Sequence, residues 1–344
     1  MSGLAALPAL YLVAGCTAYV FAWAGVPLAW LLGPLTSTAV LTMTGLNRTV
    51  VPVMTRPFGQ IVVATFVGAH FTPDALHALL ASAPLLLTAT CGVLAAAALV
   101  ARLQMRLGGS DRVTALLACV PTSPVEAGVL AERFGVDPAP VILAQTMRII
   151  MVVSLVPVLL LLGAAQGNLP PAAPHQGGVA GMALTLAAAL AGPALLRWGR
   201  ISNPFFLGPL FTAALLSALD LPSYDLPAPL LSAAQILLGT WLGACLRPDL
   251  LLRQRRLIAA MLLSSFLLIA SCALAAWGLS ALFAAPFPTV MLGMAPGGVT
   301  EMALTAGLLG LDVAFVTAMQ ITRIFLIMPN LARLVRLTAR RLHY

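Results

Sequence analysis

Long apolar runs recur from one end of this sequence to the other, and they limit what the chain can fold into. Four runs approach or exceed the roughly 20 residues that an α-helix needs to cross a bilayer: 79–101, 141–162, 179–196 and 257–279. Charged residues make up only 8% of the chain, whereas a soluble domain carries about 25%. Because so few polar side chains could cover a globule, the sequence predicts an all-α polytopic membrane protein.

The net charge of +8 arises from arginines that stand singly or in short groups between the apolar runs. This placement is typical of loops held on the cytoplasmic face of a membrane, and it does not resemble a nucleic-acid footprint. We therefore expect the lipid bilayer as a partner and no direct contact with nucleic acid.

The cysteines and histidines indicate neither a disulfide framework nor a metal site. The five cysteines lie in apolar segments without CxxC spacing, and we interpret them as small apolar residues. The four histidines form no HxH, HExxH or carboxylate–histidine pattern. No Walker loop, dinucleotide fingerprint or nucleophile elbow is present either, so we expect no metal, no cofactor and no enzyme activity.

The two halves of the sequence match each other at a constant offset of 175 residues, without gaps. Matches at Ala or Leu would mean little in such a composition, but the best stretch matches at charged, amide, Gly and Pro positions. These pairs are Pro121/Pro296, Glu126/Glu301, Gly135/Gly310, Asp137/Asp312, Gln145/Gln320 and Arg148/Arg323. The offset predicts an internal duplication.

The predicted boundary between the repeats is a Pro/Gly-containing linker at 166–178, which leaves repeats at 1–165 and 179–344. Each repeat reads as six elements, and in the first repeat the fourth begins near Leu76. The fifth is broken by Pro121 and Pro124, and its partner by residues 296–298. A bilayer tolerates a broken helix only where it is buried in protein or lines a wet cavity.

Arginine placement favours a broken element that dips into the membrane and returns. If all six elements crossed, the sixteen loop and terminal arginines would split nine to seven between the two faces. If the broken element is re-entrant, the second repeat is inverted and all sixteen fall on one face, as the positive-inside rule prefers. We therefore expect two inverted repeats of five transmembrane helices plus one re-entrant broken segment each, with about ten crossings and both termini cytoplasmic.

Inverted repeats with broken segments are typical of secondary transporters, whose sites lie near the midplane. Glu126 and Glu301 directly follow the breaks. Arg148 and Arg323 lie about three turns into the sixth elements. Gln145 and Gln320 lie one turn earlier on the same face. One interpretation is that the arginines bind an anionic group such as a carboxylate and the glutamates take up a coupling proton or cation.

The other interpretation is structural, with Glu126–Arg148 and Glu301–Arg323 salt bridges that lock each broken element to its helix. Asp137 and Asp312 are better explained as N-caps of the sixth elements.

The two broken elements are not equivalent. Gly297 and Gly298 let backbones approach closely and leave amides available to a ligand. The first repeat has Thr122 and Ser123 at these positions, so we favour the second element as the binding element. Thr300 and Ser123 are candidates to add hydroxyl groups.

The motif from Ala295 to Ala303, followed by Gly310, Asp312, Gln320 and Arg323, resembles the signature of the AbrB family of bacterial inner-membrane proteins. The resemblance covers essentially the whole chain, including the segment 30–35. In the first copy, residues 121–126 depart from the pattern, which places a symmetric two-site mechanism in doubt. The resemblance implies an inner-membrane location and a role in the regulation of gene expression. Some descriptions of the family add ammonia monooxygenase activity, which these residues do not support.

Two functions from different classes follow. The first is a secondary transporter or exporter of a small organic anion, with cation coupling and a homo-oligomeric state left open. The second is a membrane sensor or regulatory protein. Since no loop has room for a DNA-binding domain, such a protein would act on gene expression indirectly.

Overall fold

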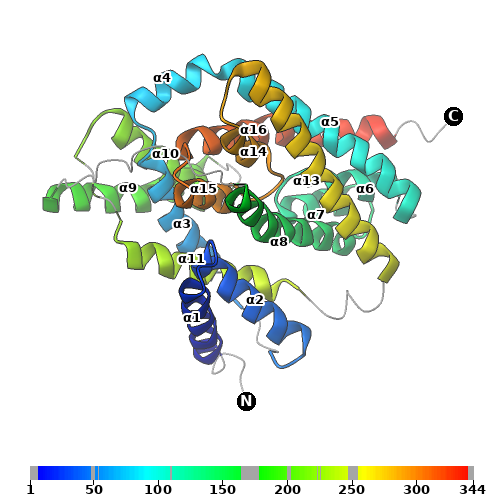
Figure 1. Cartoon of the computed structure of the whole chain (residues 1–344), viewed down its shortest axis with the longest axis horizontal. Coiled ribbons are helices and arrows are strands. Elements are labelled where there is room, and N and C mark those ends of the chain that lie inside the picture. Colours follow the sequence, from blue (N-terminus) through cyan, green and yellow to red (C-terminus); the bar gives the residue numbers. More distant parts are fainter. Residues whose placement is uncertain are drawn as a thin grey trace. The chain divides into compact units, whose positions relative to one another are not determined.

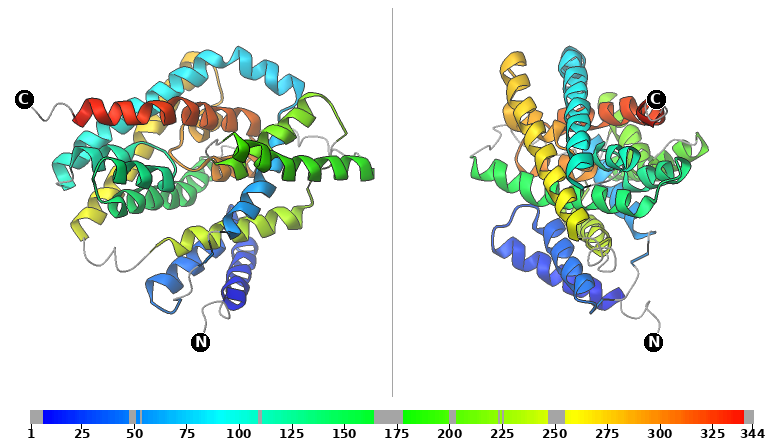
Figure 2. Two further views of the ribbon diagram at one scale, coloured as in Figure 1. Left: turned by 180° about the vertical axis from the view of Figure 1, so that it is seen from behind. Right: turned by 90° about the vertical axis from the view of Figure 1, so that its right-hand side faces the viewer.

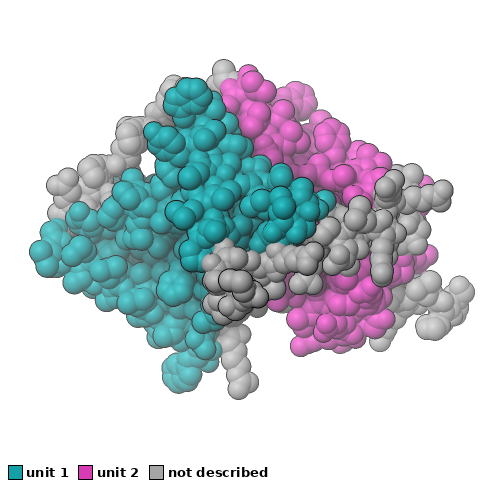
Figure 3. Space-filling model, turned by 90° about the horizontal axis from the view of Figure 1, so that it is seen from below, with its two compact units in different colours: residues 1–81, 165–246, 303–315 teal, residues 82–164, 247–302, 316–344 magenta. Residues whose placement is uncertain are grey.

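The computed structural model describes residues 7–47, 51–52, 54–108, 111–163, 178–199, 203–222, 224, 226–246 and 255–339. These residues form fifteen α-helices and no β-strand (Figures 1 and 2). They group into two compact units, each of which takes segments from both halves of the sequence (Figure 3). The bounds of these units therefore differ from the bounds of the predicted repeats.

Unit 1 consists of Met1–Ala81, Ala165–Leu246 and Ala303–Phe315. Within it, α2 packs against α1 and α11, and α10 packs against α9 and α3. Its helices are α1 (Leu7–Trp23), α2 (Ala29–Met43), α3 (Thr55–Gly68), α4 (Pro73–Ala81), α9 (Gly178–Trp198), α10 (Pro204–Ala218) and α11 (Ala228–Ala244).

Glycines set the close helix packing in unit 1. A Cβ on Gly208 of α10 would lie 2.3 Å from the carbonyl carbon of Gly192 in α9. A Cβ on Gly33 of α2 would lie 2.6 Å from the backbone of Ala18 in α1. Small residues that let backbones touch are the usual means of packing helices in a membrane.

Unit 2 consists of Ser82–Ala164, Arg247–Met302 and Val316–Tyr344. Within it, α13 packs against α5, α8 and α14, while α6 and α7 both pack against α8. Its helices are α5 (Ala83–Gly108), α6 (Arg112–Cys119), α7 (Pro124–Arg133), α8 (Pro138–Leu162), α13 (Arg255–Phe283), α14 (Phe287–Met294) and most of α16 (Val313–Ala339). Helix α15 (Val299–Leu308) starts in unit 2 and ends in unit 1.

Four helices in the described part of the chain are long and apolar enough to cross a membrane. They are Ala83–Arg106, Pro138–Leu162, Gly178–Trp198 and Ile258–Phe283. Large apolar side chains are also widely exposed, among them Trp198 at 90% and Trp23 at 85%. An all-helical chain with this surface is compatible with a membrane protein.

The fifth element of each half is broken, as predicted. Helices α6 and α7 are separated by residues 120–123, and α14 and α15 by residues 295–298. The predicted caps are also confirmed, because Asp137 Oδ1 accepts from the Ala139 amide at 2.9 Å and Asp312 Oδ1 from the Phe315 amide at 2.8 Å.

The fourth element differs from the prediction of one helix starting near Leu76. The chain forms α4 and then restarts as α5 at Ala83. Pro84 explains the restart, since a proline lacks an N–H and fits the first turn of a new helix. The predicted linker at 166–178 lies outside the described residues except for Gly178, the first residue of α9.

Candidate functional site

Unit 2 contains all ten residues that the sequence marks as candidates. Six of them belong to the two breaks or to the helix starts that follow them, and four belong to the long helices α8 and α16. The first group is Ser123, Glu126, Gly297, Gly298, Thr300 and Glu301, and the second is Gln145, Arg148, Gln320 and Arg323. The four members of the second group are all at least 97% buried.

Gln145 of α8 binds the end of the short helix α6. Its amide nitrogen donates to the carbonyls of Leu117 at 2.6 Å and Val120 at 2.8 Å. Helix ends leave such carbonyls without intrahelical partners. The glutamine therefore satisfies the backbone where proline breaks the element.

Gln320 of α16 makes the matching contacts in the second half. Its amide nitrogen donates to the carbonyls of Leu292 at 2.8 Å and Ala295 at 3.1 Å. These two carbonyls follow those of Leu117 and Val120 by 175 residues each. The two glutamines thus bind equivalent backbone positions.

The guanidinium of Arg148 is almost fully engaged. Its Nη1 donates to the carbonyls of Ala118 and Cys119 at 3.0 and 3.2 Å, and its Nη2 donates to Gln145 Oε1. Its Nε donates across to the carbonyl of Pro296 in the other broken element, at 2.9 Å.

The guanidinium of Arg323 has fewer partners. Its Nη1 donates to the carbonyl of Ala295 at 2.8 Å and its Nη2 to that of Gly297 at 3.1 Å. Within the described chain, Arg323 Nε and Gln320 Oε1 are buried and have no hydrogen-bond partner. The first-half equivalents of both atoms are bonded.

Two buried arginines, one from each half, thus converge on three consecutive carbonyls of the second break, at Ala295, Pro296 and Gly297. This backbone follows the C-terminus of α14, where the helix dipole is negative. The guanidinium charges compensate that end. Both guanidiniums thus bind backbone carbonyls at the broken elements, and Arg148 also binds the side chain of Gln145.

The glutamates occupy the first turns of the helices that follow the breaks, Glu126 in α7 and Glu301 in α15. A Cβ on Gly298 would lie 1.9 Å from Glu301 Oε2, so the carboxylate rests against the backbone at the start of α15. A negative charge at a helix N-terminus is favourable. Thr300 is buried beside it. Ser123 is the N-cap of α7, but its side chain makes no capping bond.

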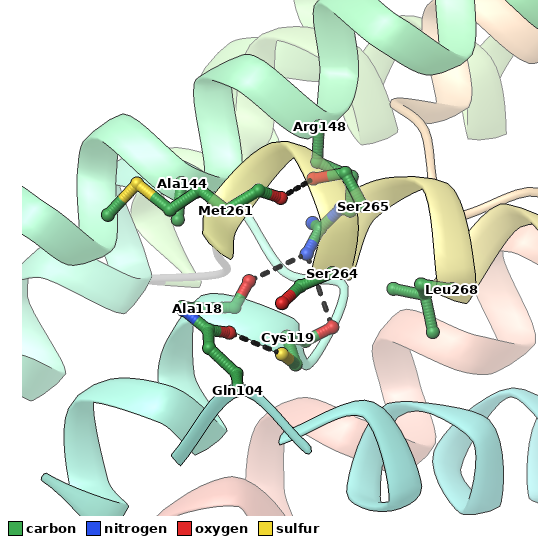
Figure 4. A pocket seen from close by; sticks show the side chains of 9 residues that line it. All are labelled: Gln104, Ala118, Cys119, Ala144, Arg148, Met261, Ser264, Ser265 and Leu268. Atoms are coloured by element: carbon green, nitrogen blue, oxygen red, sulfur yellow. Dashed lines mark hydrogen bonds between the residues drawn. The ribbon is translucent and has the colours of Figure 1, made fainter. Parts of the chain in front are cut away.

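Sequence reasoning missed a small polar cluster beside Arg148. Cys119 Sγ donates to Gln104 Oε1 at 2.9 Å, and both residues line a cavity with Arg148, Ser264 and Ser265 (Figure 4). The signal in the sequence was Gln104, a lone amide near the end of a long apolar helix. In the part of the chain that the structure describes, no group of three or more His, Cys, Asp or Glu residues could hold a metal ion.

Long apolar helices and buried arginines bound to broken helix ends are features of polytopic membrane proteins. The family model described as "Transition state regulatory protein AbrB" matches residues 30–339. The chain therefore belongs to the AbrB family.

Two relatives are similar over long stretches. "Putative regulator AbrB" of Escherichia coli (strain K12) is 27% identical over 321 residues, which cover 90% of each chain. "Uncharacterized protein YhjN" of Bacillus subtilis (strain 168) is 28% identical over 249 residues, which cover 67% of this chain and 65% of the relative.

Proposed function

We propose that this AbrB-family chain is a secondary transporter of a small organic anion in the bacterial inner membrane. The observation that carries the proposal is the partly unsatisfied guanidinium of Arg323 at the break between α14 and α15. A cation buried in a membrane protein is costly unless it is paired, and such groups commonly serve function.

A count of donors separates the two arginines. A guanidinium has five N–H donors. Arg148 uses four of them in its described contacts and Arg323 uses two. The three remaining N–H groups of Arg323 could bind a carboxylate in the fork geometry that arginine favours. We therefore assign substrate binding to Arg323 and positioning of the second break to Arg148.

The surroundings of Arg323 support an anion site. Gly297 and Gly298 lie directly before the N-terminus of α15, whose amides favour negative charge. Glu301 already rests at this helix end. A substrate carboxylate would compete with Glu301 for the same donors, and protonation of Glu301 would relieve the competition. Glu301, and Glu126 in the equivalent position, are thus candidates for proton coupling.

Helix boundaries support the two-repeat organisation that a transporter of this kind requires. Helices α2, α6 and α7 begin and end 175 residues before α10, α14 and α15, respectively. The equivalent contacts of Gln145 and Gln320 extend the correspondence to hydrogen bonds. We propose repeats at 1–165 and 179–344.

Packing within unit 2 supports a re-entrant broken element. Ala118 at the end of α6 packs against Leu143 and Ala144 in the first half of α8. A Cβ on Gly128 of α7 would lie 2.8 Å from Ile142 in that same half. Both short helices thus lie against the N-terminal half of α8, as in a hairpin. We propose about ten crossings, inverted repeats and cytoplasmic termini.

Transport measured in vesicles tests the proposal. The full chain is reconstituted into proteoliposomes, and uptake is measured with a panel of radiolabelled mono- and dicarboxylates, including lactate and succinate. We expect Arg323→Gln to lower uptake about 10- to 100-fold, the cost of losing a charged hydrogen bond. Arg333→Gln is the matched control, since Arg333 is an exposed arginine on the same helix, and we expect uptake within about twofold of the parent.

A folded Arg323→Gln variant with unchanged uptake would remove Arg323 from the mechanism. Folding is checked by the melting temperature and by size-exclusion behaviour. A proton gradient should stimulate uptake by the parent chain and not by Glu301→Gln.

A second function, indirect regulation of gene expression, is favoured by the name of the Escherichia coli relative, "Putative regulator AbrB". It predicts that deletion of the chain alters transcription while no carboxylate is transported at any pH. In neither case do we propose an enzyme activity, a cofactor or contact with nucleic acid. A homo-oligomer is compatible with both.

A further inference from the structure

A small cavity with several polar groups in its wall, which we call the chamber, lies inside unit 2, between α5, α6, α8 and α13. The volume within which the centre of a water molecule fits is about 10 Å³. All nine residues that line it are at least 92% buried. They are Gln104, Ala118, Cys119, Ala144, Arg148, Met261, Ser264, Ser265 and Leu268 (Figure 4).

One wall of the chamber contains an unsatisfied donor. Gln104 is only 1% exposed, and its Nε2 has no hydrogen-bond partner among the described residues. Its Oε1 already accepts from the Cys119 thiol. A buried amide without a partner is unfavourable, so an unsatisfied donor on a residue that lines a cavity indicates a bound acceptor.

Another wall supplies acceptors. The hydroxyl protons of Ser264 and Ser265 are donated to the carbonyls of Ala260 at 2.7 Å and Met261 at 2.8 Å. Both serine oxygens retain lone pairs. A ligand here must therefore accept from Gln104 and donate to a serine.

Size and charge decide between ligands. The open volume is that of a single water molecule, and a buried water needs two to four polar partners. A metal cation would face the positive charge of Arg148, which lines the same chamber. We propose that the chamber binds one internal water, which accepts from Gln104 Nε2 and donates to Ser264 or Ser265.

Three polar residues of the chamber have no polar equivalent in the other half of the chain, whereas Ser265 corresponds to Thr90, which keeps a hydroxyl. At the 175-residue offset, Gln104, Cys119 and Ser264 correspond to Leu279, Met294 and Ala89, none of which carries a strong hydrogen-bonding group. The proposed water would therefore lie beside Arg148 and have no counterpart beside Arg323. This inference does not depend on the transport proposal.

Radiolytic labelling tests the proposal directly. X-ray pulses convert bound water to hydroxyl radicals that oxidise adjacent sulfur atoms. Met261 lines the chamber and Met319 packs against Gly293, and both are at most 2% exposed. In the purified full-length chain we expect Met261 to oxidise several-fold faster than Met319, as measured by mass spectrometry. Equal protection of the two methionines would mean that the chamber is dry and would overturn the proposal.

Two variants sharpen the test. Ser264→Val fills the chamber and should reduce Met261 oxidation to the level of Met319. Gln104→Leu should lower the melting temperature by roughly 2–4 °C if water is bound, since the bonds to water are lost. It should raise the melting temperature if the chamber is dry, since an unsatisfied amide is removed. Cys119→Ala controls for the thiol bond, and a fall no larger than that of this control would count against bound water.

Discussion

At the scale of single residues, Gln145 and Gln320 occupy equivalent positions but make different numbers of hydrogen bonds. Gln145 donates to two carbonyls and accepts from Arg148, so all of its polar atoms are engaged. Gln320 donates to two carbonyls, but its Oε1 is without a hydrogen-bond partner in the described part of the chain. The stability of the two sites should therefore differ.

Replacing each glutamine by leucine should expose this difference. Gln145→Leu leaves two carbonyls and one arginine N–H unsatisfied, and we expect a loss of about 2–4 kcal/mol in the free energy of unfolding. Gln320→Leu also removes an unsatisfied acceptor, so its loss should be about 1–2 kcal/mol smaller. Thermal unfolding of the detergent-solubilised variants measures both. Equal losses would contradict the contacts described for Gln320.

Sequence reasoning singled out polar side chains that the structure buries, but it did not identify their hydrogen-bond partners. Arg148 and Gln145 could be chosen because polar groups in a long apolar run require a reason. Their partners are carbonyls left free where α6 and α14 end, and the sequence does not reveal which carbonyls face which side chain. The bond from Arg148 to Pro296 joins positions 148 residues apart. Such a contact follows from tertiary packing alone.

At the scale of helices, local chemistry predicted most boundaries. Prolines and glycines marked both breaks, and Asp137 and Asp312 marked the starts of α8 and α16. The restart at Ala83 was missed because α4 and α5 lie in one nearly continuous apolar run. Within that run, Pro84 is the residue that indicates a new helix start.

The close contact of α9 and α10 gives a prediction at this scale. Gly208→Ala would place a Cβ 2.3 Å from the Gly192 backbone, which cannot move without separating the helices. We expect a loss of about 1–3 kcal/mol in the free energy of unfolding. Gly15→Ala in α1 is the control, because no atom lies within 4 Å of its Cβ position. This control should be neutral or stabilising by up to about 1 kcal/mol. Both are measured by thermal unfolding, and similar melting temperatures for the two variants would mean that α9 and α10 are not in close contact.

At the scale of the whole molecule, each compact unit combines the same elements from both halves. Helices α1–α3 and α9–α11 belong to unit 1, while α5–α8 belong with α13, α14 and most of α16 to unit 2. A tandem pair of independently folded repeats would instead group residues 1–165 apart from 179–344. Packing between segments from the two halves, such as α2 against α11 and α5 against α13, interleaves the units. The relative orientation of the proposed repeats decides whether a substrate site in this arrangement can open in turn to each side of the membrane.

Orientation can be measured at two equivalent positions, Arg112 at the start of α6 and Phe287 at the start of α14. Inverted repeats place them on opposite faces, and the positive-inside rule assigns Arg112 to the cytoplasm. In a cysteine-free background, Arg112→Cys should react with an impermeant maleimide only after cells are opened, whereas Phe287→Cys should react in intact spheroplasts. Labelling of both positions from the same side would mean parallel repeats. The two breaks would then enter from one face, and a site shared between opposed hairpins would be geometrically excluded.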